Sequence, residues 1–248
     1  HIKAREVQGG DKIAKVSIPF ITSAGLILIP QVSKKMDEAD QPAVQSLLDD
    51  AFRFFAFFSV PIMMGMLVLS RECVLVFSGR QFADATLSMQ IVSVLPVLVG
   101  FGFYFNSLVL IPGGKHKQMF ISVVAGMFLS IVLNFLLAPL YRHNGASVAI
   151  VATEILVTTL YYYFARKYFK YTYDWPFLLK SLLCVLPFIL IVSAVRWFDM
   201  TPLLTLIISV LLCAISYFAL QYIVFKNTFV LKVINFALAK AGIKKILD

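Results

Sequence analysis

Glu154 is the residue whose type and position most directly indicate chemistry. It is the one carboxylate of GASVAIVATEILVTTLYYYFARK, the apolar segment 145–167. An acid near the centre of a bilayer costs on the order of 3 kcal/mol even on insertion scales, so it requires a proton, a cation, water or a hydrogen-bonding neighbour. Because ionisable residues inside membranes mark ion and substrate pathways, we interpret Glu154 as a functional acid. A neutral acid hydrogen-bonded to another helix is the structural alternative.

Other polar side chains recur along single faces of three apolar segments, at helical spacings of three, four or seven. The faces comprise Gln90, Ser93, Gly100, Tyr104 and Ser107 in the first segment; Ser122, Gly126, Ser130 and Asn134 in the second; and Ser147, Glu154, Thr158 and Tyr161 or Tyr162 in the third. Such faces can line a common cavity, or they can be surfaces through which membrane helices pack. We favour packing for the second segment and a cavity for the third, because the third contains the acid.

Two cations near helix ends extend this set of candidates. Arg53 is expected at the entrance of the second span and Lys15 near the start of the first. Both side chains can snorkel to the membrane surface, or face a cavity and bind a phosphate. The candidate ligands for a substrate or an ion are therefore Glu154, Asn134, Arg53, Lys15, Gln90, Tyr104 and Thr158.

The sequence has no pattern typical of a catalytic or metal centre. Cys73, Cys184 and Cys213 have no paired spacing and lie in or beside apolar runs, so we interpret them as small hydrophobic residues. The three histidines are scattered over loops and the start of the chain. No nucleophile–base pair or metal triad is found. We expect neither enzymatic activity nor a metal or other cofactor.

The composition indicates an integral membrane protein that positions these residues on spanning helices. Of the 248 residues 60% are hydrophobic and 14% charged, and the mean hydropathy is +0.87. The predicted fold is an all-α bundle of about seven transmembrane helices, each near the roughly 20 residues that a bilayer core requires. The candidate spans are 13–33, 52–70, 86–112, 119–140, 145–166, 177–197 and 202–225.

Prolines fall inside four of these spans, at Pro19, Pro61, Pro96 and Pro187. Proline lacks an amide donor and clashes with the preceding turn, so each proline predicts a kink. In lipid the freed carbonyl groups need partners from neighbouring helices or from cavity water. Kinked helices around a wet cavity are common in transporters, although they also occur in other membrane proteins.

Basic residues predict the orientation of the bundle. Lysine and arginine are more numerous at one set of helix ends, which includes Lys34, Lys115 and Lys167. The positive-inside rule places this side and the C-terminus in the cytoplasm, with 226–248 as a basic amphipathic tail. The net charge of +9 then reflects topology rather than nucleic-acid binding. Because the chain starts at His1 with its N-terminus outside, we expect further helices upstream.

Aromatic residues crowd the end of the fifth span and the loop that follows. An aromatic belt at the membrane surface explains them, and a platform on which sugars stack is the alternative. The residues are Tyr161, Tyr162, Tyr163, Tyr168, Tyr171, Tyr173 and Trp175.

Several loop motifs resemble those of a known family in their order and spacing. The motifs are LIPQVS (28–33), FSGRQFADA (77–85), IPGGKHK (111–117) and LNFLLAPLYRHNGASVAIVATE (133–154). Together they resemble the C-terminal half of the polysaccharide (O-antigen or capsule) flippases, within the multidrug/oligosaccharidyl-lipid/polysaccharide exporter superfamily. The resemblance covers roughly 13–170, whereas the last two helices and the tail are generic.

The resemblance implies a two-lobed fold of twelve to fourteen helices around a central cavity. It also implies ion-coupled alternating access for an undecaprenyl-diphosphate-linked oligosaccharide. Matched positions are Pro30, Ser33, Gly79, Phe82, Gly114, Lys115, Asn134, Gly145, Ala146 and Glu154; of these, only Glu154 and Asn134 are expected to contact substrate or ion. The family's glycine-x-tyrosine pattern is only loosely met by GGDKIAK at 9–15, which has no tyrosine.

The predicted protein is thus the C-terminal lobe, 1–225, of a flippase in the bacterial cytoplasmic membrane, lacking its N-terminal lobe. Its expected partners are the lipid-linked oligosaccharide, membrane lipid, a coupling proton or sodium ion and the missing lobe, and no nucleic acid. Since alternating access requires two lobes, we expect no transport by this chain alone. A drug or metabolite exporter of the same superfamily and a membrane enzyme of polysaccharide assembly are the alternatives.

Overall fold

The computed structural model describes residues 25, 26 and 28–223, which form helices joined by short loops with no strand among them. Most of the expected first span, including Lys15 and Pro19, lies outside the described residues. The expected tail at 226–248 also lies outside them. The visible part of the first helix, 28–37, ends at a two-residue turn before α3.

Six helical stretches within these ranges are long and apolar enough to cross a membrane, and they correspond to the remaining six expected spans. The helices are α3 (Gln41–Val68), α4 (Ser70–Phe77), η1 (Arg80–Ala85), α5 (Thr86–Val92), α6 (Leu95–Phe103), η2 (Tyr104–Leu110), α7 (His116–Tyr168), α8 (Trp175–Cys184), α9 (Pro187–Arg196) and α10 (Pro202–Ile223). The α4 helix, which ends in the apolar residues VLVF (74–77), is a short element between two spans.

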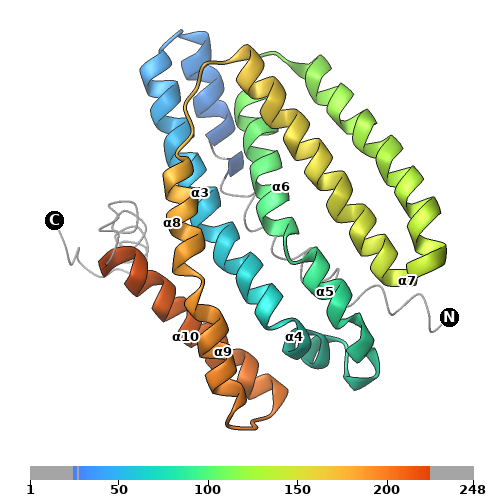
Figure 1. The fold of residues 1–248 in the computed structure, drawn as a ribbon. Helices are drawn as coiled ribbons and strands as arrows, with labels where there is room; N and C mark the ends of the chain where they lie inside the picture. The colour runs from blue at the N-terminus through green and yellow to red at the C-terminus, as the bar shows by residue number, and fades with distance from the viewer. Residues whose placement is uncertain (1–24, 27, 224–248) are drawn as a thin grey trace.

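The α3 helix lies at the centre of the bundle (Figure 1). On one side it contacts α6, which in turn packs against α7. On its other side it contacts α8, α9 and α10. Its buried side chains, among them Phe52, Phe55 and Phe57, form the middle of the hydrophobic core. The fourth and fifth expected spans therefore lie on one flank of α3, and the last two lie on the other.

The α7 element folds back on itself as a hairpin of two spans, His116–Tyr141 and His143–Tyr168 (Figure 1). A straight helix would separate Gln118 and Tyr168 by roughly 75 Å at ~1.5 Å per residue. Instead the Gln118 side-chain amide donates to the Tyr168 hydroxyl at 3.1 Å. Glycine is required at Gly145 because a Cβ there would collide with the backbone of Leu137.

Two prolines break the spans that contain them, as the sequence predicts. The third span is interrupted between α5 and α6, just before Pro96, and the sixth between α8 and α9, just before Pro187. Each proline then occupies one of the first two positions of the new helix, where no amide donor is required. Pro61, in contrast, lies inside a continuous α3.

The carbonyl group that Pro61 leaves without its helical donor finds a partner on another helix. The lost donor would have bonded the carbonyl of Phe57, four residues earlier. That oxygen accepts a hydrogen bond from the Tyr217 hydroxyl of α10 at 3.0 Å. Gln221 in turn donates to the Tyr217 hydroxyl at 3.2 Å and to the Ser181 hydroxyl at 3.1 Å. A neighbouring helix thus supplies the partner that the freed carbonyl requires in lipid.

The buried face of α10 is a polar stripe with a residue at every fourth position. It consists of Thr205, Ser209, Cys213, Tyr217 and Gln221. The remaining faces carry exposed leucine, isoleucine, valine and phenylalanine side chains. This arrangement is expected where lipid solvates the apolar faces and helix contacts satisfy the polar one. The stripe is not among the predictions made from sequence, in which the last two helices are generic.

Replacing Tyr217 with phenylalanine is expected to destabilise the bundle by about 1 kcal/mol, because the Phe57 carbonyl loses its partner and Gln221 loses an acceptor. For a chain of this size that corresponds to a melting temperature lower by roughly 2–4 °C. Thermal unfolding in detergent micelles would measure the change. Tyr222→Phe is the matched control, because Tyr222 is an exposed tyrosine of the same helix. Equal melting temperatures for the two variants would contradict the assigned bond.

Candidate functional site

Three spans line an open cavity of about 510 Å³, which we call the Glu154 cavity. Its walls come from α6 and η2 and from both limbs of α7. Apolar side chains such as Phe103 and Val157 form much of the lining. The polar groups that face it come from Asn106, Ser107, Ser130, Thr153, Glu154 and Tyr161. The cavity therefore gathers members of all three polar faces that the sequence analysis identified.

Close helix packing gives the cavity its shape. Gly126 lies so close to Val157 of the other α7 limb that a Cβ there would meet a Val157 methyl group. Gly102 of α6 lies close to Thr158, whose hydroxyl donates to the Leu98 carbonyl at 3.0 Å. Both glycines line the cavity. The polar faces therefore have both of the expected roles. Their small residues permit close helix packing, and they also leave room for polar groups to line the cavity.

Glu154 has no hydrogen-bond or ion-pair partner anywhere in the described ranges, although its side chain is partly buried. Not every hydroxyl group nearby is free to bond to it. The Thr153 hydroxyl, for example, donates to the Ala149 carbonyl at 2.7 Å. A structural acid would be expected to hydrogen-bond to an adjacent helix, and no such bond is found among these residues. The carboxyl group is therefore available to a ligand in the cavity.

Asn106 also lines the cavity, although it is not among the ligands predicted from sequence. Its side-chain oxygen is buried and has no hydrogen-bond partner among the described residues. A regular helical period in the third span places Tyr104 and Ser107 on the polar face. Residues 104–110 instead form a π-helical turn, in which bonds run between residues five apart. The wider turn changes the phase, so Asn106 and Ser107 line the cavity.

Two further candidates lie beside the cavity. Thr158 is one turn from Glu154 and is bonded to α6 as described above. The Asn134 amide donates to the Ser130 carbonyl at 2.9 Å and to the Ser130 hydroxyl at 3.3 Å, and Ser130 lines the cavity. Asn134 can therefore influence the site through Ser130. Its expected direct contact with a ligand stays a prediction.

The remaining candidates lie elsewhere, so the structure does not bring them to Glu154. Tyr104 is fully buried among Phe52, Phe55 and other aromatic residues, and its hydroxyl has no partner in the described part of the chain. Gln90 is exposed on α5. Arg53 forms an ion pair with Asp174 at 2.8 Å. Lys15 lies outside the described residues, and the binding roles of all four stay predictions.

The chemistry of the Glu154 cavity is that of an oxygen-rich site inside a membrane. A carboxylate, an amide oxygen and several hydroxyl groups can ligate a hard cation or relay a proton. Within the described ranges, no three histidine, cysteine or acidic side chains are grouped as a transition metal would require. The fold and site together define a class: a polytopic membrane protein with an acid in an intramembrane cavity, as in ion-coupled transporters.

The family follows from sequence. The sequence model of the family described as lipid II flippase MurJ matches residues 16–217, most of the chain. The protein belongs to this family, and the expected resemblance to flippases is confirmed. Its members are transporters, which confirms the expectation that the chain is not an enzyme. It is a multi-pass membrane protein.

Individual relatives agree with this assignment. A putative O-antigen transporter of Escherichia coli (strain K12) is 29% identical over 109 residues, covering 44% of this chain and 25% of the relative. The lipid II flippase MurJ of Bacillus subtilis (strain 168) is 23% identical over 165 residues, covering 65% and 30%. The chain thus spans about a quarter to a third of the length of these curated relatives.

A solved structure shows the same fold. The lipid II flippase MurJ in its inward closed conformation superposes with a TM-score of 0.60 at 15% identity. The match covers 91% of this chain and 53% of the flippase. The expectation of an all-α membrane bundle with the fold of an exporter is confirmed.

Proposed function

We propose that this chain forms the C-terminal lobe of a flippase that moves an undecaprenyl-diphosphate-linked oligosaccharide across the bacterial cytoplasmic membrane. The observation that carries the proposal is Glu154, an acid without a partner in the described ranges, in a cavity between membrane spans. Family membership supports the class of cargo. The names of the relatives include both lipid II and O-antigen. We therefore propose a lipid-linked oligosaccharide as the cargo and do not choose between these two.

In this proposal Glu154 binds the coupling ion, a proton or sodium, and Asn106 supplies a second oxygen. Ion binding in the cavity would stabilise one arrangement of α6 and α7 over another, and a ligand shifts a conformational equilibrium only by such differential binding. A second helical lobe completes the transport pathway, because alternating access requires two lobes that move about a shared site.

The proposed topology places the lysine-rich end of the bundle and the C-terminus in the cytoplasm. The structure supports this proposal because the loops carrying those lysines lie together. Residues 36–37, 112–113 and 168–171 line one cavity, and the Lys115 ammonium group lies 4.6 Å from the centre of the Tyr168 ring. Lysine-bearing loops gathered at one end of the bundle are what the positive-inside rule predicts for the cytoplasmic end.

Depletion of the protein in its native bacterium is expected to trap lipid-linked oligosaccharide on the cytoplasmic face. Extracted intermediates should accumulate several-fold, and they should be protected from a membrane-impermeant sugar oxidant added outside intact cells. Expression of the wild-type gene should restore both readouts. Normal surface exposure of the intermediate after depletion would refute the proposed function.

A further inference from the structure

A second cavity, of about 430 Å³, lies at the basic end of the bundle, and we call it the loop cavity. It is formed where the end of the first helix, the loop before α7 and the loop after α7 meet. Its polar and aromatic lining includes Asp37, Gln41, Tyr168, Phe169, Lys170 and Tyr171. The volume falls in the range of roughly 300–1,000 Å³ that is typical of small-molecule sites.

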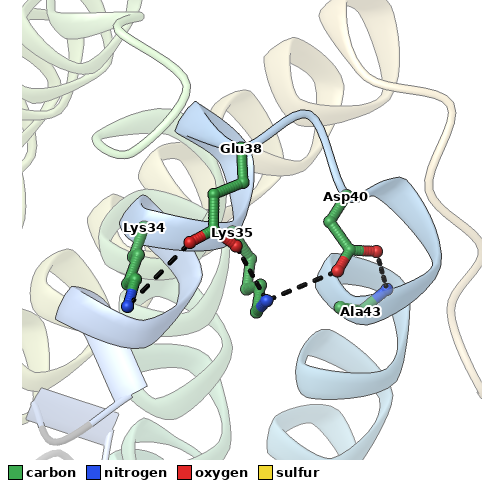
Figure 2. A network of polar contacts seen from close by, with 5 residues as sticks. All are labelled: Lys34, Lys35, Glu38, Asp40 and Ala43. Atoms are coloured by element: carbon green, nitrogen blue, oxygen red, sulfur yellow. Dashed lines mark hydrogen bonds and ion pairs between the residues drawn. The ribbon is translucent and has the colours of Figure 1, made fainter.

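One wall is held in place by ion pairs at the turn between the first helix and α3 (Figure 2). The Lys35 ammonium group lies 2.8 Å from a Glu38 carboxylate oxygen and 3.4 Å from one of Asp40. Asp40 also accepts a hydrogen bond from the Ala43 amide at 3.2 Å, capping α3. This network fixes the turn that places Asp37 on one side and Gln41 on the other.

The opposite wall is fastened to α3 by contacts distant in sequence. Gln45 and Thr172 exchange two hydrogen bonds, of 2.9 and 3.1 Å, and so dock the loop after α7. Two residues further on, the Arg53–Asp174 ion pair of 2.8 Å anchors the start of α8. Because both walls are attached to α3, the loop cavity is preformed, which lowers the entropic cost of binding a ligand.

The aromatic residues Phe169 and Tyr171 pack tightly together in the lining of the loop cavity. Phe169 lies against Gly113, where a Cβ would collide with the Phe169 ring. Phe169 also stacks on Tyr171, with 5.6 Å between ring centroids and 8° between planes. Tyr171 is partly buried and has no second aromatic partner in the described part of the chain. Because Tyr171 lines the loop cavity, a ligand there can reach its ring.

The polar groups of the loop cavity are uncommitted and electrically balanced. Within the described ranges Asp37, Gln41 and Lys170 have no side-chain hydrogen bond or ion pair. Burial raises the pKa of Tyr171, so its phenol is neutral at pH 7 and can donate and accept. One acid, one base, an amide and a phenol favour a neutral ligand rich in hydroxyl groups.

We propose that the loop cavity binds a sugar ring of the lipid-linked oligosaccharide, with the ring stacked on Tyr171 and its hydroxyl groups bonded to Asp37, Gln41 and Lys170. The C–H face of a pyranose carries partial positive charge and complements the negative face of an aromatic ring. This inference rests on the proposed function, which brings such a headgroup to the basic end of the bundle. The loop cavity would then be a first contact for the glycan, separate from the Glu154 cavity.

An anionic phosphate group fits the loop cavity less well. Asp37 would repel an anion, and Lys170 is the one lysine among the lining residues. The neighbouring lysines, Lys115 and Lys167, lie over the Tyr168 ring, 4.6 and 5.9 Å from its centre. A phospholipid headgroup is therefore the alternative ligand, and the experiment must distinguish it from the sugar.

Photo-crosslinking in intact cells tests the assignment directly. A benzoylphenylalanine at Gln41, which lines the loop cavity, is expected to capture lipid-linked oligosaccharide carrying a radiolabelled sugar. The same group at Lys117 is the control, because Lys117 is exposed near the start of α7 but does not line the cavity. We expect several-fold more sugar label at Gln41. Tyr171→Ala should reduce that yield several-fold, whereas Tyr171→Phe, which retains the ring, should preserve it.

Equal sugar labelling at Gln41 and Lys117 would overturn the inference, as would capture of labelled phospholipid in place of sugar. The depletion experiment separates the two proposals. If depletion traps the intermediate but Gln41 captures no sugar, only the sugar site is refuted. If depletion traps nothing, the proposed function itself fails. Protein abundance in the membrane is measured for every variant, and the comparison of Gln41 with Lys117 does not depend on Tyr171 variants folding.

Discussion

Export of surface polysaccharide is expected to fall on the order of 10- to 100-fold in a Glu154→Gln variant, while the protein remains folded in the membrane. Glutamine keeps the shape of the side chain and removes its charge. A hydrogen bond or ligand contact to a charged group contributes about 1.5–3 kcal/mol, which corresponds to this range in rate or affinity. The substitution should be tolerated structurally, because Glu154 has no protein partner to lose in the described ranges.

The measurement is surface polysaccharide per cell, with the amount of protein in the membrane as reference. Asp84→Asn is the matched control, since Asp84 is an exposed acid at the end of a span and should tolerate loss of its charge. Varying external pH and sodium separately would then identify the coupling ion. Unchanged export in the Glu154→Gln variant would show that the acid is neutral and structural, and the ion site would have to lie elsewhere.

Replacing Arg196 with methionine is expected to produce the largest loss of stability among the substitutions considered. Its guanidinium group donates to both carboxylate oxygens of Glu72, each at 2.8 Å, and to the Val68 carbonyl at 2.8 Å. The Glu72 side chain is 8% exposed and that of Arg196 is 41% exposed. Breaking a fully buried pair costs about 3–5 kcal/mol, and partial exposure of the arginine reduces the expectation to about 2–3 kcal/mol.

Thermal unfolding in detergent should show a melting temperature lower by roughly 5–10 °C. Arg71→Met provides the control, because Arg71 is an exposed neighbour of Glu72 and no ion pair involves it within the described ranges. Adding Glu72→Gln to Arg196→Met should recover part of the loss, since the double variant no longer buries an unpaired charge. If Arg71→Met and Arg196→Met lower the melting temperature equally, the Arg196–Glu72 ion pair does not stabilise the contact between α4 and α9.

The aromatic residues at the end of the fifth span and after it form one pattern in the sequence, but they have different environments in the structure. The sequence pattern predicts an aromatic belt for all of them. Tyr163 and Tyr168 are exposed, as a belt requires. Tyr162 and Tyr173 instead lie in a buried cluster with Phe105, at ring separations of 5.2–5.9 Å. Burial also raises the pKa of Tyr173. The sequence cannot assign these rings to lipid or core, because helix rotation is set by packing.

The candidate site was predictable in part, and the reason differs for each residue. Glu154 could be found from sequence alone because a lone acid in an apolar span is costly wherever the helix faces. Asn106 could have been noticed by the same criterion, as an amide within an apolar run. Its position in the cavity required the π-helical turn of η2, which a regular helical period does not anticipate. Arg53 was expected to be a candidate ligand, and its pairing with Asp174 depends on a contact 121 residues away.

By itself the sequence determined that this is a helical membrane protein, where six of its spans lie and which span contains an acid. These properties follow from local hydrophobicity over about 20 residues and from the cost of charge in lipid, neither of which depends on neighbouring helices. Only the tertiary structure decided that Asn106, Ser130 and Glu154 share a cavity, that Tyr217 satisfies the carbonyl freed by Pro61, and that the end of the first helix and two loops line a second cavity. Those contacts depend on the rotation and depth of each helix, which the packing of distant segments fixes and no local pattern encodes.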